Sequence, residues 1–318
     1  MVRVLDVADA SDDVLDGVYD VMAQCHVEVS AEAPYRSRAE AVAFLLHPPE
    51  SETREYWITE SNGACVGFGQ LGVGSALPTA RVEILVHPDH RGAGHGTALL
   101  EAVRRQAAAG GARVLIGAHA TEAGSRFAAA AGAVDSQRDV HSVLRLPVTL
   151  DTVSVSGYRL RSWVGAAPAE LLDSFARARE AINDAPFPSD EEVAVWDGDR
   201  VRDLEAALER RDREIRVTVA LDEHGEVVAF TELRVSRAHG ATASTEDTAV
   251  VRGHRRKGLG RWVKAESLRL LQEDRPDVTQ VTTVNAEENR AILGINEALG
   301  FEPVAVWTSC VLGLASDA

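Results

Sequence analysis

The sequence is poor in the features that mark exported, membrane-embedded and nucleic-acid-binding proteins. It has three cysteines, Cys25, Cys65 and Cys310, an odd number whose spacing matches neither a metal site nor a redox motif. No apolar run is long enough to cross a membrane, and the acidic N-terminus lacks the basic and apolar regions of an export signal. The net charge of −16 argues against nucleic acid as a partner. These absences predict a cytoplasmic protein that binds neither membranes nor nucleic acid.

The most informative feature present is one arrangement that occurs twice: a strand, then a glycine-punctuated basic turn, then a helix. The first copy spans Val82–Leu100 and the second spans Asp247–Val263. Both copies fit Arg-x-x-Gly-x-Gly, and their arginines, Arg91 and Arg255, lie 164 residues apart. Such a turn presents backbone N–H groups at the positive end of a helix, which favours binding of a pyrophosphate. The length of 318 residues suits two domains that each carry such a site.

Lysine is nearly absent, whereas arginine and alanine are abundant, which is typical of genomic base composition. Of the two lysines present, Lys257 lies in the second copy of the motif and Lys264 directly follows its last residue, Val263.

Hydrophobic periodicity predicts the same order of elements in both halves. Each half is expected to run strand, helix, helix, three strands, helix, strand, helix, strand, which forms a mixed sheet with helices on its faces. The predicted domains are 1–147 and 157–318, joined by the turn-rich linker 148–156. The last strand of each half is expected near 139–146 and at 303–313.

The order of strand, Arg-x-x-Gly-x-Gly turn, helix, strand and an Asn-containing helix ending in Gly-Phe resembles the GNAT superfamily of acyl-CoA-dependent acyltransferases, in the tandem form found in actinomycetes. The second half carries the whole pattern through Asn285–Phe301. The resemblance implies two GNAT-like α/β domains, each with a mixed, mostly antiparallel sheet and a splayed central strand. Thr121 and Ala133 stand in the first half where Asn289 and Phe301 stand in the second, so the first domain is expected to be degenerate and the second catalytic.

The resemblance implies that acetyl-CoA binds at the glycine turns. Backbone N–H groups of residues 256–261 would hold the pyrophosphate with help from basic side chains, and the pantetheine arm would pair with the edge of strand 247–251. The cofactor-binding residues implied in the second half are Val250, Val251, Arg255, Arg256, Lys257, Gly258, Leu259, Gly260, Arg261 and Asn289. Their counterparts in the first half are Val86, Arg91, Gly92, Gly94, Gly96 and Thr97.

The implied chemistry is direct transfer of an acetyl group to a primary amine in a ternary complex, which needs no covalent nucleophile and no metal. Asp247 is the candidate general base and corresponds to Glu83, although a solvated or cap-forming aspartate fits the same position. Glu232 is a reserve base that is expected on the surface. Asn296 stands where many family members carry an acidic tyrosine; it cannot release a proton, but it can hydrogen-bond the leaving sulfur.

The resemblance places the acceptor site in the loop 183–197 and around Trp307–Cys310. Acidic and aromatic residues of that loop suit a cationic small-molecule amine, although they also fit a solvated loop. The protein is expected to be a monomer or a homodimer. The alternative function is a catalytically degenerate acyl-CoA-binding sensor or structural protein, which the missing tyrosine favours and the carboxylate and Asn289 of the second half oppose.

Overall fold

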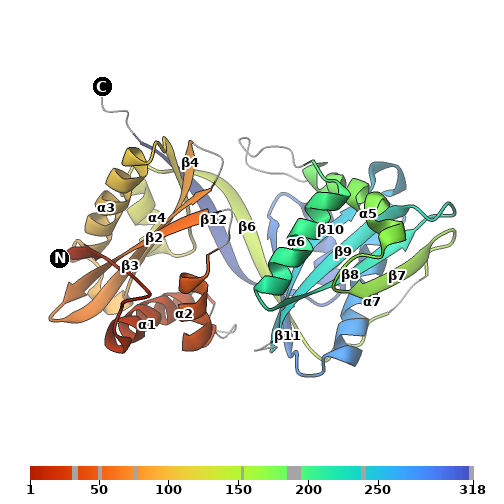
Figure 1. Ribbon diagram of the computed structural model, residues 1–318, viewed down its shortest axis with the longest axis horizontal. Helices are drawn as coiled ribbons and strands as arrows, with labels where there is room; N and C mark the ends of the chain where they lie inside the picture. The colour runs from red at the N-terminus through yellow and green to blue at the C-terminus, as the bar shows by residue number, and fades with distance from the viewer. Residues whose placement is uncertain are drawn as a thin grey trace. The chain divides into compact units, whose positions relative to one another are not determined.

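The computed structural model describes residues 1–30, 35–48, 52–74, 78–151, 154–184, 195–237 and 241–314. Contacts divide the chain into two units: unit 1 is Met1–Arg138 together with Ala305–Ala318, and unit 2 is Asp139–Val304. Each unit is a mixed sheet flanked by helices, which confirms the predicted fold class (Figure 1). Within the described ranges, no helix combines the length and the apolarity needed to cross a membrane.

The sheet of unit 1 has the strand order β1-β2-β3-β4-β5-β12. The β4–β5 pair is parallel, and the other pairs are antiparallel. The strands are β1 (Val2–Val4), β2 (Glu52–Ser61), β3 (Ala64–Gly74), β4 (Thr79–Val86), β5 (Val114–His119) and β12 (Glu302–Gly313).

Helices cover both faces of this sheet. One face is buried under α1 and α2, whose apolar residues pack with Tyr56, Ile58 and Phe68. The other is buried under α3, which packs against Trp57 and Leu71. Alternate residues of β2 therefore face opposite cores, as the pleat of a strand requires. The helices of unit 1 are α1 (Asp12–Val29), α2 (Arg38–Leu46), α3 (His95–Ala109) and α4 (Glu122–Ala130).

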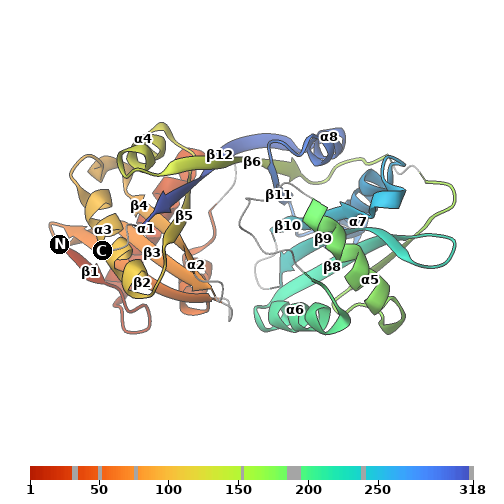
Figure 2. The same cartoon turned by 90° about the horizontal axis from the view of Figure 1, so that it is seen from above.

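The sheet of unit 2 has the strand order β6-β11-β10-β9-β8-β7, and its β10–β11 pair is parallel. Helices α5 and α6 lie over one face and α7 lies over the other (Figure 2). The strands are β6 (Val134–Arg145), β7 (Arg159–Val164), β8 (Arg213–Leu221), β9 (Val227–Ser236), β10 (Thr242–Val250) and β11 (Gln280–Ala286). The helices are α5 (Leu172–Arg179), α6 (Gly198–Arg210), α7 (Leu259–Asp274) and α8 (Arg290–Ala298).

The last strand of each sequence half extends the sheet of the other unit. Residues 139–145 of β6 pair with β11 inside unit 2. Residues 308–313 of β12 pair with β5 inside unit 1. Contacts therefore divide the chain after Arg138 and after Val304, whereas the boundaries at 147 and 157 stay a prediction about the linear sequence.

In each unit the parallel strands pair along only part of their length. The β4–β5 register runs from Thr79 to Arg81, and the β10–β11 register runs from Thr242 to Thr245. Past these residues the two parallel strands no longer hydrogen-bond to each other. Backbone N–H and C=O groups require partners when they are buried, so the facing edges of the two strands are free to bind another chain. Each opening lies beside a glycine turn, because the turn directly follows β4 or β10.

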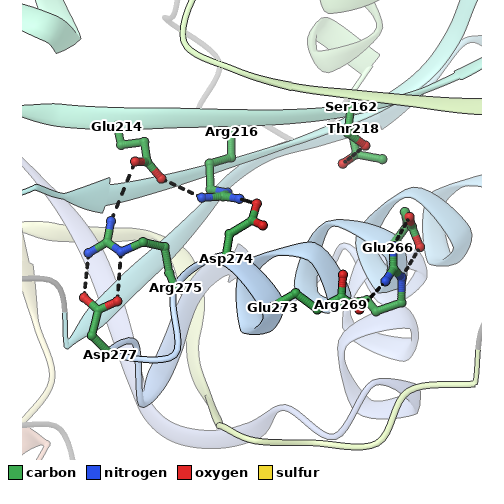
Figure 3. Close-up of polar contacts among 10 residues, drawn as sticks. All are labelled: Ser162, Glu214, Arg216, Thr218, Glu266, Arg269, Glu273, Asp274, Arg275 and Asp277. Carbon is green, nitrogen blue, oxygen red and sulfur yellow. Dashed lines mark hydrogen bonds and ion pairs between the residues drawn. The ribbon is translucent and has the colours of Figure 1, made fainter.

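An ion-pair cluster joins β8 to the C-terminal end of α7 (Figure 3). The buried Arg216 of β8 donates to Glu214 at 2.8 Å and also to Asp274. Arg275 lies 3.7 Å from Glu214 and bonds Asp277 at 2.7 Å. The cluster compensates the charge of Arg216, which would otherwise be costly to bury.

A second ion cluster on α7 is more exposed and offers a matched comparison. Arg269 bonds Glu266 at 2.7 Å and Glu273 at 2.5 Å, and its side chain is 38% exposed. Exposed pairs of this kind contribute little to stability because solvent screens them.

We expect Arg216→Met to lower the free energy of unfolding by about 2 kcal/mol, between the values for exposed and buried ion pairs. Arg269→Met should cost less than about 0.5 kcal/mol because its pairs are exposed. Urea denaturation of both variants measures the difference. Equal losses would contradict the importance assigned to burial of Arg216.

Candidate functional site

The turn before α7 is fixed by the first arginine of its motif. Arg255 donates through Nε to the carbonyl of Val250 at 2.9 Å and through Nη2 to Asp184 at 2.5 Å. A short 3₁₀ turn, Arg252–His254, leads into it. The Arg255 guanidinium thus ties the turn to the end of β10, and its predicted contact with a phosphate stays a prediction.

The turn before α3 is built in the same way. Arg91 donates through Nε to the carbonyl of Val86 at 3.2 Å and binds both oxygens of Glu28 at 2.8 and 2.6 Å. The hydrogen bond from Arg91 lowers the pKa of Glu28, so this pair stays ionised at neutral pH. The first arginine of Arg-x-x-Gly-x-Gly therefore has the same structural task in both units.

Both turns use the left-handed backbone region at equivalent positions. In unit 2 these positions are Arg256 (φ +64°) and Gly258 (φ +85°), and in unit 1 they are Gly92 (φ +78°) and Gly94 (φ +85°). Side chains are rarely found in this region, which explains the glycine of the motif. Arg256 adopts the same left-handed conformation as its counterpart Gly92, although it is not a glycine.

The helices that follow these turns begin without a side-chain cap. The N-cap positions of α3 and α7 are Gly94 and Gly258, which have no side chain; α1 and α5 also lack a side-chain cap, whereas α2, α4, α6 and α8 each begin with a side chain that accepts a backbone N–H bond. First-turn N–H groups have no acceptor inside their own helix, and the helix dipole is positive there. Both turns therefore suit an anion such as a pyrophosphate. The first-turn residues are His95, Gly96 and Thr97 in α3 and Leu259, Gly260 and Arg261 in α7.

The last glycine of the motif allows close helix packing. A Cβ atom on Gly260 would lie 3.1 Å from the Ile295 side chain of α8, and one on Gly96 would lie 3.2 Å from the Phe127 ring of α4. The two glycines of each motif thus have different tasks. The first, Gly94 or Gly258, adopts the backbone conformation of the turn, and the second, Gly96 or Gly260, lets the neighbouring helix pack closely.

Lys257 lies at the edge of the second turn, held by an aromatic side chain. Its Nζ donates to the hydroxyl of Tyr158 at 2.7 Å, and the same hydroxyl lies 3.0 Å from Nδ1 of His254. Val250 packs in the apolar cluster beside this group, whereas Val251 packs on the α5 and α6 side. The predicted cofactor-binding residues between Val250 and Arg261 therefore lie at the end of β10, in the turn and in the first turn of α7, whereas Asn289 lies at the start of α8.

Asp247 lies at an irregularity in β10. The register against β9 shifts between Thr245 and Thr248, so Glu246 and Asp247 together face one residue of β9. A bulge of this kind bends the strand and redirects side chains. The corresponding strand of unit 1, β4, pairs with β3 without a register shift. The bulge therefore distinguishes the Asp247 site from the otherwise similar site of unit 1.

Burial gives Asp247 an unusual affinity for protons. The pKa of Asp247 is raised to about 6: desolvation raises it most, the nearby charge of Glu232 also raises it, and Arg179 lowers it. Arg179 Nη2 donates to Asp247 at 2.9 Å, yet the aspartate side chain remains 35% exposed. Asp247 is thus accessible, oriented and ionised at neutral pH, as a general base requires.

Glu232 is fully buried, so its predicted surface position is wrong. It lies on β9, which is covered on both faces by helices, and it is neutralised by Arg179 and by Arg234 at 3.3 Å. The Arg179 guanidinium also lies 4.0 Å from the centroid of the Trp196 ring. A single arginine from the end of α5 therefore serves two carboxylates and one aromatic face.

Asn296 is buried inside a polar chain. Its Nδ2 donates to Asn285 at 2.7 Å, and its Oδ1 accepts from Nζ of Lys264. Asn289 begins α8 by accepting the N–H of Ile292 at 3.4 Å. Asn289 therefore has a structural role as a helix cap, and its contact with the pantetheine arm stays a prediction.

A cavity of about 880 Å³ lies inside unit 1, between α1, β4, β5, α4 and β12. Glu83, the counterpart of Asp247, is accessible from within it, and desolvation by the surrounding walls raises the pKa of Glu83 while Arg36 and Arg54 lower it. Thr121 caps α4 by accepting the N–H of Gly124, as Asn289 caps α8. The cavity is also lined by all the cofactor-binding residues predicted for the first half, Val86, Arg91, Gly92, Gly94, Gly96 and Thr97.

Comparisons with known proteins identify the family. A model of the acetyltransferase (GNAT) domain matches residues 52–132, and a model of the acetyltransferase (GNAT) family matches residues 175–301. The chain belongs to the GNAT acetyltransferases. Its two GNAT units each contain one of these matches, which agrees with the duplicated motif.

Relatives in sequence and structure support a tandem GNAT arrangement. Mycothiol acetyltransferase of Streptomyces bingchenggensis is 31% identical over 147 residues, covering 44% of this chain and only 47% of that protein. The enzyme of the same name from Salinispora tropica is 28% identical over 287 residues, covering 84% and 83%. A tandem GNAT protein from the clavulanic acid biosynthesis pathway superposes with a TM-score of 0.80 at 26% identity, covering 100% of this chain and 99% of the other. A GCN5-related N-acetyltransferase from Sphaerobacter thermophilus shares the fold at 15% identity and a TM-score of 0.75, covering 100% and 96%.

The sequence predicted two segments of the acceptor site in the second GNAT unit, and the structure bears on them differently. Trp307, Ser309 and Cys310 belong to unit 1 and line its cavity, so their assignment to the second unit's acceptor site is wrong. The reason is the exchange of β12, which no local sequence signal reveals. Residues 185–194 of the predicted acceptor loop lie outside the described residues, while Asp184 and Trp196 at its ends contact Arg255 and Arg179.

Sequence reasoning missed two residues that organise the second GNAT unit. Arg179 gave no signal, because an arginine near a helix end is ordinarily a surface residue. Lys264 gave one: it follows Gly260 by four residues and precedes Leu268 by four, which places it on the apolar face of α7. In the part of the chain that the structure describes, no cluster of His, Cys, Asp or Glu could hold a metal ion.

We expect Arg179→Leu to lower the free energy of unfolding by about 3 kcal/mol, because Glu232 would keep a buried charge with only Arg234 beside it. Arg200 contacts the same Trp196 ring, at 4.7 Å, but lies on the surface. Arg200→Leu should therefore cost less than about 1 kcal/mol. Thermal and urea unfolding compare the two variants, and a smaller loss for Arg179→Leu would contradict its assigned role.

Proposed function

We propose that the protein transfers an acetyl group from acetyl-CoA to a primary amine of a small molecule, directly within a ternary complex, with Asp247 as the general base. One observation carries this proposal. An accessible carboxylate lies on a bulged strand that separates from its parallel neighbour, next to a helix N-terminus that has no side-chain cap. Family membership supports the reaction class.

The residues around the second turn fit acetyl-CoA as the acyl donor. Uncapped first-turn N–H groups of α7 suit its pyrophosphate, and the basic residues Arg256, Lys257 and Arg261 lie on or beside the turn. The unpaired end of β10 offers backbone groups to an amide chain, as an added strand would require. Acetyl-CoA supplies the acetyl group as a thioester whose sulfur is the leaving atom.

Asp247 removes the proton that an incoming amine must lose. Its pKa of about 6 keeps it ionised at neutral pH and lets it share a proton with an ammonium group. Arg179 fixes the carboxylate orientation through Oδ2. Glu246, its neighbour on β10, is engaged elsewhere, accepting from Ser244 at 2.6 Å and facing Arg234 at 3.5 Å.

The acceptor we propose is a small amine. The relatives named mycothiol acetyltransferase support acetylation of a small molecule, and the net charge of −16 suits a cationic acceptor better than nucleic acid. A cytoplasmic location and a monomeric or dimeric state remain expectations. Apart from the missing tyrosine, nothing favours the catalytically degenerate alternative, and Asp247 has the exposure and pKa of a working base.

We also propose that unit 1 binds acyl-CoA. Its cavity brings the first glycine turn, the separated ends of β4 and β5, and Glu83 into one space large enough for a sizeable ligand. The chain would then bind two donor molecules, one in each GNAT unit.

Calorimetric titration with acetyl-CoA tests both sites. We expect two equivalents to bind wild-type protein and one to bind either Gly94→Arg or Gly258→Arg, because a side chain at these positions obstructs the turn. Gly63→Arg is the matched control: Gly63 has φ +82°, no atom lies within 4 Å of its Cβ position, and it is in the turn between β2 and β3. No binding by wild type would refute the proposed function.

A pH profile tests the base. With acetyl-CoA and a broad amine panel, release of free thiol by wild type should fall below pH 6, where Asp247 takes up a proton. Asp247→Asn should lower kcat/KM by about 10²-fold or more and remove that acidic limb. Glu246→Gln, which alters the adjacent carboxylate, should leave the limb in place. An unchanged profile in Asp247→Asn would show that another group is the base.

A further inference from the structure

A buried lysine in unit 2 has no carboxylate partner among the described residues. Lys264 is 1% exposed, and its Nζ donates to Oδ1 of Asn296 and lies 4.6 Å from the centroid of the Phe301 ring. Asn296 in turn donates to Asn285. A charged ammonium is costly to bury beside only amides and an aromatic ring. Packing alone therefore does not explain why a lysine occupies this buried position.

The internal duplication shows which space these side chains occupy. Lys264 and Leu100 each follow the last motif glycine by four residues, and Asn296 and Ala128 each precede Gly300 or Gly132 by four. Phe301 corresponds in the same way to Ala133.

Asn285 corresponds to His119 through strand pairing. Val281 pairs with Ala243 and Leu115 pairs with Ala80, and both pairs belong to the core under the helix that follows the glycine turn. Asn285 and His119 each lie four residues further along their strand. The four counterparts in unit 1, Leu100, His119, Ala128 and Ala133, all line the cavity of about 880 Å³.

The polar chain of unit 2 therefore occupies the region that is open in unit 1. This region adjoins the separation of β10 from β11 and the N-terminal turn of α7. A donor held by that turn and lying along the free end of β10 would bring its thioester toward Asn296 and Lys264. Asp247 approaches the same strand end from the α5 side, where Arg179 holds it.

We propose that Lys264, oriented by Asn296, donates the proton to the sulfur that leaves during acyl transfer in unit 2. This inference rests on the proposed function. The acceptor nitrogen forms the new bond to the acyl carbon, and the carbon–sulfur bond breaks with its electron pair on sulfur. Asp247 receives the proton lost by the acceptor, the Lys264 ammonium gives a proton to sulfur, and neutral Lys264 is reprotonated from solvent.

The proton affinity of Lys264 suits this step. Burial alone lowers the pKa of Lys264 to about 7, with no charged group among the described residues contributing. The groups that face it are the amides of Asn296 and Asn285 and the ring of Phe301. An ammonium with this pKa transfers its proton readily to a thiolate, whose own pKa is about 8.5. Because the pKa of Lys264 is close to neutral pH, the neutral amine also recovers a proton from solvent in each cycle.

Lys264→Met tests the proton donor in the Gly94→Arg background, where only unit 2 binds acetyl-CoA. We expect kcat to fall by about 10²-fold while KM for acetyl-CoA changes less than about threefold. The decline of kcat/KM above pH 7 in the parent protein should disappear. Leu268→Met, one turn further along α7 and equally buried, is the control for a changed side chain in the core and should retain the parent profile.

A binding measurement keeps the test independent of the acceptor amine. The parent protein should bind coenzyme A at least about fivefold more tightly than desulfo-coenzyme A at pH 7, because the sulfur meets the Lys264 ammonium. Lys264→Met should abolish this preference. Lys264→Arg should keep it, since arginine retains the charge, yet should remain as slow in turnover because a guanidinium does not release its proton.

Three results would overturn the inference. One is turnover by Lys264→Met with an unchanged rate and pH profile. Another is tighter binding of acetyl-CoA by Lys264→Met, which would show that the lysine side chain occupies space that the acyl group needs. The third is equal affinity of the parent for coenzyme A and its desulfo analogue. If the sulfur preference depends on Lys264 but no amine is acetylated, the proposed acetyl transfer fails while the lysine–sulfur contact stands.

Discussion

Incomplete pairing of two parallel strands is the constraint on which the site in each unit depends. A parallel ladder would normally continue, but β4 and β10 leave theirs after a few residues and expose backbone groups beside a helix N-terminus. Everything nearby compensates for this opening. Arg91 and Arg255 bind the last carbonyl of the departing strand, and left-handed residues then turn the chain into the next helix.

The two units treat the opened space differently. Unit 1 leaves a cavity in this space, whereas unit 2 places the buried side chains of Lys264, Asn296 and Phe301 at the corresponding positions. Charge burial in unit 2 is balanced on one side by Arg179 between two carboxylates, and on the other by amides around Lys264. Desolvation moves the proton affinities of Asp247 and Lys264 toward neutrality from opposite directions. One duplicated scaffold thus carries one site that is a cavity and one site in which buried polar side chains occupy the corresponding positions.

Local signals in the sequence were sufficient for the fold but not for the surroundings of the site. The predicted helix order and the glycine turns depend on spacing within about twenty residues, and the structure places these elements close to their predicted positions. Arg179 and Glu232 are separated by 53 residues, and their pairing depends on how α5 lies over β9. Sequence periodicity carries no information on such a contact, so Glu232 was misplaced. Trp307 was misassigned for the same reason, because strand exchange is a long-range property.

The exchanged terminal strands also bear on how the two halves of the chain depend on each other. Here a fragment that stopped at the linker would lack the strand that pairs with β5, and the remaining fragment would lack the strand that pairs with β11. Each half of the chain supplies a strand to the sheet that the other half begins. Strand pairing thereby makes the two sheets depend on both halves of the chain, even though the two sites differ in chemistry.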